Sequence, residues 1–445
     1  MIVLLHGWSD HSESFKPLVA KLAGLGLNEI VPINLGDYVS MDDDVTFDDI
    51  IRAMQAAWKK ANLPTAPRSV DVIVHSTGAL VIRHWMTSCF TPESNPVRRL
   101  LMLAPANFGS HLAHKGVSFI GRIAKGFKSD RLFHTGEKIL RGLELASPFT
   151  WELGRKDRLQ GGPAWYGPGR VLATVLVGTG GYTGISAAAN TSGSDGTVLV
   201  STANLNPAFA QFDFATDPAE PTLMTIEANG RTAFCRVPGE NHNTIAGKDN
   251  GPKNPVTLQL IRQALAVTDA GFDAHCQALA TLNAQHRRAE QSHAYTQGYQ
   301  NLVMYVEDDQ GQPVGDYFIE VFVKQQGRNA VDNTLTAIVQ REVMASVHTN
   351  QVNSAFRSLK MNCDILQTHL IDGMRPLYIS ITAHPEIKDT RSVGYSTISY
   401  KDIGSIKIDI NDLGKIFMED RTLFVHLVIK RTQVESLVRF AKAAV

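Results

Sequence analysis

The first 268 residues alternate between short, continuously apolar runs and longer segments whose apolar positions recur with helical spacing. Continuous apolar runs are typical of strands buried on both faces, and spacings of three and four residues are typical of helices with one buried face. The expected strands are residues 2–5, 29–33, 70–74, 100–104, 171–177 and 232–237, and the expected helices are residues 14–23, 47–61 and 79–88. This order predicts a mostly parallel sheet covered by helices on both faces.

One long segment, residues 107–170, interrupts the alternation and ends in the Gly/Pro-rich stretch GGPAWYGPG. An insertion of this size in an α/β sheet predicts a helical cap over the carboxyl ends of the strands, where ligands bind. From His111 to Asp130 apolar positions at helical spacing are surrounded by lysines and arginines, as in a helix that lies at a lipid surface. A cap helix packed on the sheet, with a solvated basic face, explains the same pattern.

The pattern changes after residue 268. Residues 269–297 predict a helical connector, and from residue 298 onward short runs of alternating polarity are separated by turn residues. This alternation predicts an all-β sandwich of roughly seven strands. Because 445 residues are too many for one ordinary core, we expect a catalytic domain over 1–268, with its cap at about 107–170, the connector, and a β-sandwich accessory domain over 298–445.

Composition and charge argue against several kinds of ligand for this protein, namely nucleic acids, metal ions and cofactors. Lys plus Arg and Asp plus Glu number 43 each, so no overall field attracts nucleic acid, and no nucleic-acid partner is expected. The four cysteines lie far apart without C-x-x-C spacing. The acidic run MDDDVTFDD at 41–49 is more simply explained as charge before a helix N-terminus than as a metal site. No glycine-rich phosphate loop stands at a strand–helix junction, and therefore no metal or cofactor is expected.

The N-terminus, MIVLLHGW, lacks the basic start and the longer apolar stretch of a secretory signal. No segment approaches the apolar length of a membrane span. These observations predict a protein that is cytoplasmic as synthesised, and export without a cleaved signal stays open.

Candidate chemistry begins at VDVIVHSTGAL, residues 70–80, where a strand turns into a helix. A tight strand–turn–helix junction holds the hydroxyl of Ser76 clear of the backbone, as the serine-hydrolase pattern G-x-S-x-G does. Gly78 satisfies the second glycine position, and Val74 stands at the first. A loop after the first strand, His6-Gly7-Trp8, can direct a backbone N–H toward the point reached by the N–H of Thr77. Two such donors form an oxyanion hole.

A nucleophilic serine also needs a base and an acid, in the chain order serine, acid, histidine for this type of fold. Asp195 lies in an S-D-G turn after the strand 171–177, and His242 lies in a polar loop after the strand 232–237. An ordinary Asp-Gly turn and a solvated loop histidine are the alternatives. Asp213 and Asp217 are the rival acids, but they lie further from an expected strand end.

These motifs together resemble the α/β-hydrolase superfamily: HG-W after the first strand, H-S-x-G, LAPANFGS, S-D-G-x-V and N-H-N. Within it they are most similar to bacterial lipases and to phospholipase-like or deacylase-like esterases, over roughly residues 1–268. The resemblance implies that Ser76 is the nucleophile, His242 the general base and acid, and Asp195 the group that orients the imidazole. It also implies oxyanion donors at the backbones of Trp8 and Thr77. Val74 and the absence of the superfamily's first two strands depart from its full pattern.

The expected activity is cofactor-independent hydrolysis of carboxylic esters, with lipid or phospholipid acyl esters as substrates and an acyl-enzyme intermediate. Acyl transfer and thioester cleavage would use the same triad. An alternative from another class is a catalytically idle interaction protein that works through its β domain. The expected partners are the acyl substrate, a membrane surface in peripheral contact with the cap, and a protein that binds the β domain.

Overall fold

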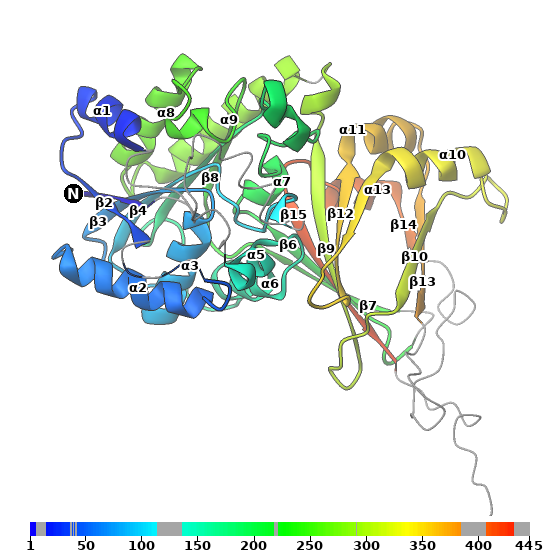
Figure 1. The fold of residues 1–445 in the computed structure, drawn as a ribbon. Helices are drawn as coiled ribbons and strands as arrows, with labels where there is room; N and C mark the ends of the chain where they lie inside the picture. The colour runs from blue at the N-terminus through cyan, green and yellow to red at the C-terminus, as the bar shows by residue number, and fades with distance from the viewer. Residues whose placement is uncertain are drawn as a thin grey trace, which may run out of the picture. The chain divides into compact units, whose positions relative to one another are not determined.

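A computed structural model describes residues 1–5, 15–35, 38, 40, 42–113, 136–217, 221–290, 292–383 and 406–430 (Figure 1). The chain forms two compact units. The first comprises Met1–Ala208, Glu227–Tyr299 and Asp420–Thr422, and the second comprises Phe209–Ile226, Gln300–Glu419 and the chain from Leu423.

The first unit contains a six-stranded sheet in the order β2-β1-β3-β4-β5-β8. Its strands are β1 (Ile2–Leu5), β2 (Ile30–Ile33), β3 (Val70–His75), β4 (Val97–Leu103), β5 (Leu172–Gly178) and β8 (Ala233–Val237). Every neighbouring pair in this sheet is parallel. All residues of β1, β3 and β5 are buried, which explains their continuous apolar sequences. The predicted parallel sheet is confirmed.

Helices cover both faces of this sheet (Figure 1). On one face lie α1 (Lys16–Gly24), α8 (Pro255–Ala266) and α9 (Phe272–Glu290), and on the other lie α2 (Phe47–Lys60) and α3 (Gly78–Cys89). Apolar residues of α1, α8 and α9 share one core cluster with strand residues, for example Leu18, Ile261 and Leu279 with Leu101. The predicted connector is therefore largely α9, a helix that packs within the first unit.

The segment predicted as a cap is described at residues 107–113 and 136–170. It contains α5 (Glu137–Leu143), α6 (Pro148–Gly154) and the π-helical turn Arg155–Leu159. The basic helix expected between His111 and Asp130 lies almost wholly outside the described residues, so its contact with a lipid surface stays a prediction. No helix among the described parts of the chain is long and apolar enough to cross a membrane.

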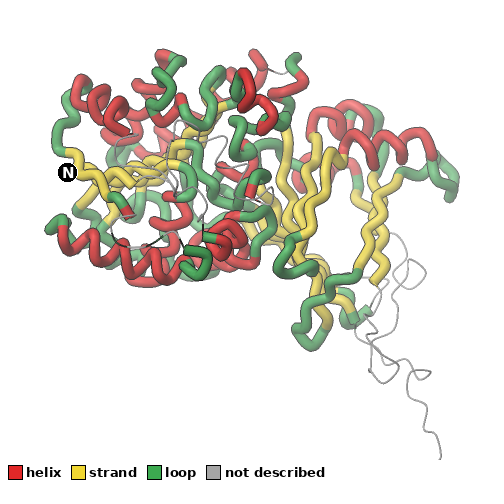
Figure 2. Tube along the Cα trace, in the orientation of Figure 1, coloured by secondary structure: helices red, strands yellow, loops and turns green. Residues whose placement is uncertain are grey.

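The second unit is a β domain with two sheets (Figure 2). The smaller sheet has the order β10-β13-β14 and the larger β11-β12-β9-β15-β6-β7. The strands are β6 (Ala208–Asp213), β7 (Thr222–Glu227), β9 (Tyr299–Asp308), β10 (Tyr317–Phe322), β11 (Met344–Thr349), β12 (Phe356–Asn362), β13 (Leu377–Ala383), β14 (Ile406–Ile408) and β15 (Thr422–Ile429). The described residues of this unit also form the short helices α10 (Asn333–Ile338), α11 (Cys363–Leu366) and α13 (Ile410–Ile416).

The second unit also takes in a stretch of chain that precedes residue 268. Strands β6 and β7 come before β8 in sequence, yet they continue the larger sheet of the β domain beyond β15. The two units therefore do not divide at one point, as the sequence-based boundary supposed. The physical reason is that β6 finds its strand partner in β15, about two hundred residues later, and local periodicity carries no information on such pairing.

Candidate active site

A sharp turn at Ser76 joins β3 to α3. Ser76 has a φ of 55°, in the left-handed region that residues with a side chain rarely adopt. Its backbone N–H donates to the carbonyl of Leu103 on β4 (3.2 Å), and its carbonyl accepts from the N–H of Ala106 (3.2 Å). These bonds hold the strained residue between neighbouring segments and leave the hydroxyl half-exposed beyond the end of the strand.

His242 lies within hydrogen-bonding distance of this hydroxyl. Its Nε2 is 3.0 Å from Ser76 Oγ, and its Nδ1 is 2.9 Å from Oδ2 of Asp195. Because the carboxylate accepts the Nδ1 proton, Nε2 is left as the acceptor for the serine proton. The backbone N–H of His242 also donates to the carbonyl of Asp195 (3.0 Å). The arrangement can therefore withdraw a proton from Ser76 and return it to a leaving group.

Asp195 is fully buried, and its second carboxylate oxygen is hydrogen-bonded as well. Oδ1 accepts from the backbone N–H groups of Thr197 (2.9 Å) and Val198 (2.7 Å). The hydroxyl of Tyr182 lies 2.8 Å from that of Thr197. Burial, together with the nearby Asp195 charge, raises the pKa of Tyr182, so this phenol stays neutral. The two residues that follow the S-D-G turn thus supply backbone donors that fix the orientation of the buried carboxylate against His242.

The three residues come together because each follows a strand of the same parallel sheet: Ser76 follows β3, Asp195 follows β5, and His242 follows β8. Of the two expected oxyanion donors, Thr77 is buried at the N-terminus of α3, where the first backbone N–H groups lack intrahelical acceptors. Trp8 lies outside the described residues. The rival acid Asp213 ends β6 in the second unit, where its Oδ1 accepts from the N–H of Ala215.

Sequence reasoning gave no role to two buried residues beside the site. His75 Nε2 is 2.9 Å from the carbonyl of His242, and the two rings lie 4.6 Å apart. Glu240 is fully buried, and its Oε1 accepts from the N–H of Asn254 (2.7 Å) and the hydroxyl of Thr257 (2.8 Å) at the start of α8. Both residues fix the loop that carries His242. Their closeness in sequence to Ser76 and His242 is the only signal that could have identified them.

A buried ion pair fixes α3, the helix that follows Ser76. Arg83 binds Asp157 through two hydrogen bonds, Nε to Oδ2 (2.7 Å) and Nη2 to Oδ1 (2.8 Å), and both side chains are fully buried. The hydroxyl of Tyr166 also donates to Asp157 (2.8 Å). Burial lowers the pKa of Arg83, but the Asp157 carboxylate outweighs it and raises the pKa above its ordinary value. The pair ties α3 to the turn Arg155–Leu159 within the predicted cap.

No group of histidine, cysteine, aspartate and glutamate side chains within the described ranges is arranged to hold a metal ion. The site itself consists of a hydroxyl, an imidazole and a carboxylate at the carboxyl end of the sheet.

Comparison with known structures shows a relative that shares the whole fold. The phospholipase PlaB from Legionella pneumophila has a TM-score of 0.78 at 23% identity, over 100% of this chain and 96% of PlaB. A second PlaB structure, in complex with thio-NAD, has a TM-score of 0.77 at 23% identity with the same coverage. The likeness includes the β domain as well as the parallel sheet. No curated protein sequence matches the chain significantly.

The family model for alpha/beta hydrolases matches residues 2–319, well over half of the chain. This match agrees with the parallel sheet and with the strand ends on which Ser76, Asp195 and His242 lie. The chain belongs to the alpha/beta hydrolase family.

Proposed function

We propose that the protein is a serine hydrolase that cleaves carboxylic esters through Ser76, His242 and Asp195. The observation that carries the proposal is the continuous chain of hydrogen bonds from Ser76 Oγ through the imidazole to the Asp195 carboxylate. A serine hydroxyl becomes a useful nucleophile only when a base of this kind removes its proton.

In the proposed reaction, Ser76 Oγ attacks the ester carbonyl carbon while His242 Nε2 takes the hydroxyl proton. The negative charge on the carbonyl oxygen is met by the backbone N–H groups of Thr77 and Trp8, each of which contributes on the order of 10²–10³ in rate. His242 then gives its proton to the departing alcohol, which leaves an acyl group on Ser76. A water molecule that gives a proton to His242 then attacks the acyl-enzyme, the acid leaves, and the proton returns to Ser76 Oγ, while Asp195 keeps the imidazole oriented.

We propose lipid or phospholipid acyl esters as the substrates. The motifs that resemble bacterial lipases support this class, as does the similarity in fold to a protein named as a phospholipase. Thio-NAD is a ligand of that protein in one of its structures, and the chemistry proposed for this chain requires no cofactor. Contact between a membrane and the cap remains part of the proposal, as does a protein partner of the β domain.

A fluorophosphonate probe tests the proposal, because it labels an activated serine whatever the substrate. Wild-type protein should be labelled and should hydrolyse a short-chain 4-nitrophenyl ester. Ser76→Ala should lose both properties, with a fall in kcat of about 10⁶. Ser69→Ala is the matched control, since Ser69 is half-exposed and its hydroxyl donates only to the carbonyl of Ala66. Labelling that persisted in Ser76→Ala would place the nucleophile elsewhere.

The substrate class needs a separate measurement. Release of fatty acid from phosphatidylcholine vesicles should depend on Ser76 in the same way as hydrolysis of the short ester. Turnover of the short ester without any release from vesicles would leave an esterase and exclude the phospholipid substrate. Products that carry the acyl group on an added alcohol or thiol, instead of free acid, would indicate acyl transfer by the same triad.

A further inference from the structure

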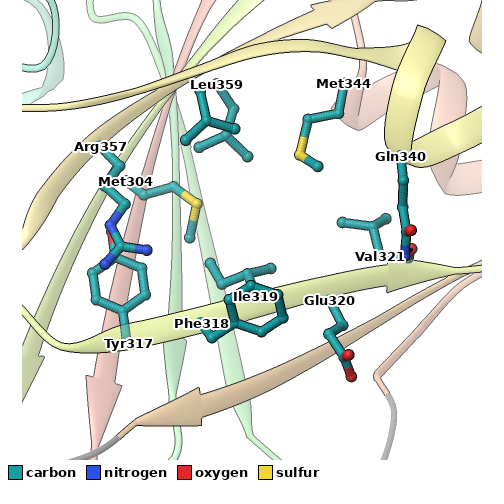
Figure 3. Close-up of a pocket in the computed structure, with 11 residues that line it drawn as sticks. Met304, Tyr317, Phe318, Ile319, Glu320, Val321, Gln340, Met344, Arg357 and Leu359 are labelled. Carbon is teal, nitrogen blue, oxygen red and sulfur yellow. Dashed lines mark hydrogen bonds between the residues drawn. The ribbon is translucent and has the colours of Figure 1, made fainter.

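A cavity of about 320 Å³ lies within the β domain, between its two sheets (Figure 3). One wall is β10 of the smaller sheet, from Tyr317 to Val321, and the opposite wall comes from β9, β11 and β12 of the larger sheet. The volume is that of a small-molecule site. None of the residues that line it belongs to the proposed catalytic machinery.

The middle of the cavity is apolar. Met304 and Leu359 extend into it from the larger sheet, and Ile319 and Val321 face them from β10. Met344 lies at the far end, beside Gln340, whose side-chain amide donates to the carbonyl of Val321 (3.1 Å) (Figure 3). Methionine side chains adapt to flexible hydrocarbon better than branched ones do. The lining therefore suits an aliphatic chain.

A single guanidinium closes the other end. Arg357 stacks on the ring of Tyr317, with its Cζ 3.7 Å from the ring centroid, and its Nη2 donates to the carbonyl of Gly315 (3.1 Å). Its Nε is buried and has no hydrogen-bond acceptor in the described part of the chain. No carboxylate of the described residues forms an ion pair with Arg357. Glu320 also contributes to the lining, but its side chain is exposed and lies on the far side of β10 from Met304 and Leu359 (Figure 3).

Arg357 is half-buried, and its buried Nε–H has no acceptor among the described residues, so an anion at this end of the cavity would give that N–H a partner. The planar guanidinium matches a carboxylate, which can accept two of its N–H groups at once. A phosphate monoester would bring about −1.5 to −2 charges to a single cation. One positive group at the end of an apolar cavity therefore favours a singly charged carboxylate.

We propose that this cavity binds a fatty acid, with its carboxylate on Arg357 and its hydrocarbon chain along Met304, Ile319 and Leu359 toward Met344. The inference rests on the β domain alone and does not depend on the hydrolysis proposed above. It gives the second unit a ligand of its own, which the proposed hydrolysis does not require.

The test is calorimetric titration of the full-length chain with dodecanoate, and with dodecyltrimethylammonium as a probe of equal chain length and opposite charge, both below their micellar concentrations. Wild-type protein should bind dodecanoate and not the cationic probe. Arg357→Met should weaken binding roughly 10- to 100-fold, as expected from the loss of hydrogen bonds to a charged group. Arg328→Met, which removes an exposed arginine from the same unit, is the control and should bind as wild type.

Ile319→Trp provides a second, independent variant, because Ile319 is half-buried and a larger ring there would occupy the cavity. It should abolish dodecanoate binding and leave the rate on a short ester unchanged. Binding that is unchanged in either Arg357→Met or Ile319→Trp, or absent from wild type, overturns the proposal. Equal binding of the two probes overturns the carboxylate contact. None of these results bears on the role of Ser76.

Discussion

The substitution Asp157→Asn should destabilise the first unit strongly, although it only replaces one carboxylate oxygen with an amide nitrogen. Asp157 lies in the turn Arg155–Leu159, and it receives two hydrogen bonds from Arg83 and one from Tyr166. All three side chains are fully or almost fully buried. The change removes the only carboxylate that forms an ion pair with Arg83 among the described residues.

The magnitude follows from burial. Removing one partner of a buried ion pair leaves an uncompensated charge in the interior, which costs about 3–5 kcal/mol. The hydrogen bond from Tyr166 contributes less to stability than the ion pair does. Tyr166→Phe should therefore lower the free energy of unfolding by about 1 kcal/mol. Asp273→Asn is the matched control, because Asp273 pairs with Arg231 at 2.9 Å with both side chains more than half exposed. That pair should contribute no more than about 1 kcal/mol.

Tryptophan fluorescence during urea unfolding is the assay. All five tryptophans lie before residue 166, within the part of the sequence assigned to the first unit, Met1–Ala208. Their emission therefore reports the first unit without a contribution from the β domain. This separation matters because a protein with two units need not unfold in one step.

The double variant Arg83→Met/Asp157→Leu tests the reason for the loss. If the cost arises from the unpaired charge, the double variant should be more stable than Asp157→Asn, since apolar groups of similar volume replace the pair. An Asp157→Asn protein within 1 kcal/mol of wild type would refute the argument. A double variant less stable than the single one would show that packing, and not charge, determines the cost.

Three further substitutions test the site. Asp195→Asn should lower kcat on a short ester about 10⁴-fold, because the imidazole loses its orienting acceptor. The kcat of Asp213→Asn should stay near that of the wild type. A larger loss of kcat in Asp213→Asn than in Asp195→Asn would contradict the assignment of Asp195 as the acid. Val74→Gly should lower the free energy of unfolding, measured in urea, by about 3 kcal/mol, because three buried carbons are lost and glycine gives the unfolded backbone more conformational freedom. It should not raise kcat. Gly178→Ala should lower kcat in a folded protein, since the new Cβ would collide with the carbonyl oxygen of Glu240 and displace the His242 loop; unchanged kinetics would show that the loop adjusts.

The parallel sheet and the placement of the three candidate residues could be predicted because both depend on local pattern. Continuous apolar runs identify strands that are buried on both faces, and in a parallel sheet the residues after those strands gather at one edge. Ser76, Asp195 and His242 each follow such a run, and the structure brings their side chains within hydrogen-bonding distance of one another. Their catalytic roles remain a proposal.

Contacts between distant parts of the chain could not be predicted in this way. The sequence of strand β6, AFAQFD, does not say that its neighbour is β15. Likewise, the place of α9 between two regions of different pattern suggested a connector, although Leu279 is buried in the core of the first unit. Glu240 is a further case, because a glutamate in a loop is usually solvated and here it is fully buried against the start of α8.

Val74 stands where the G-x-S-x-G pattern has its first glycine. It shows whether the backbone conformation or the packing of side chains requires glycine at that position. Within residues 70–78, all of which are described, Ser76 alone has a positive φ. Val74 is still an ordinary strand residue, opposite Leu5 on β1 and Met102 on β4, and its side chain is fully buried. The backbone of this chain therefore makes no demand for glycine at position 74, because the turn begins only at Ser76. What the position requires is room for a side chain beneath the turn. A valine that fills such a space adds buried apolar area to the strand that carries the nucleophile, and the geometry at Ser76 is retained.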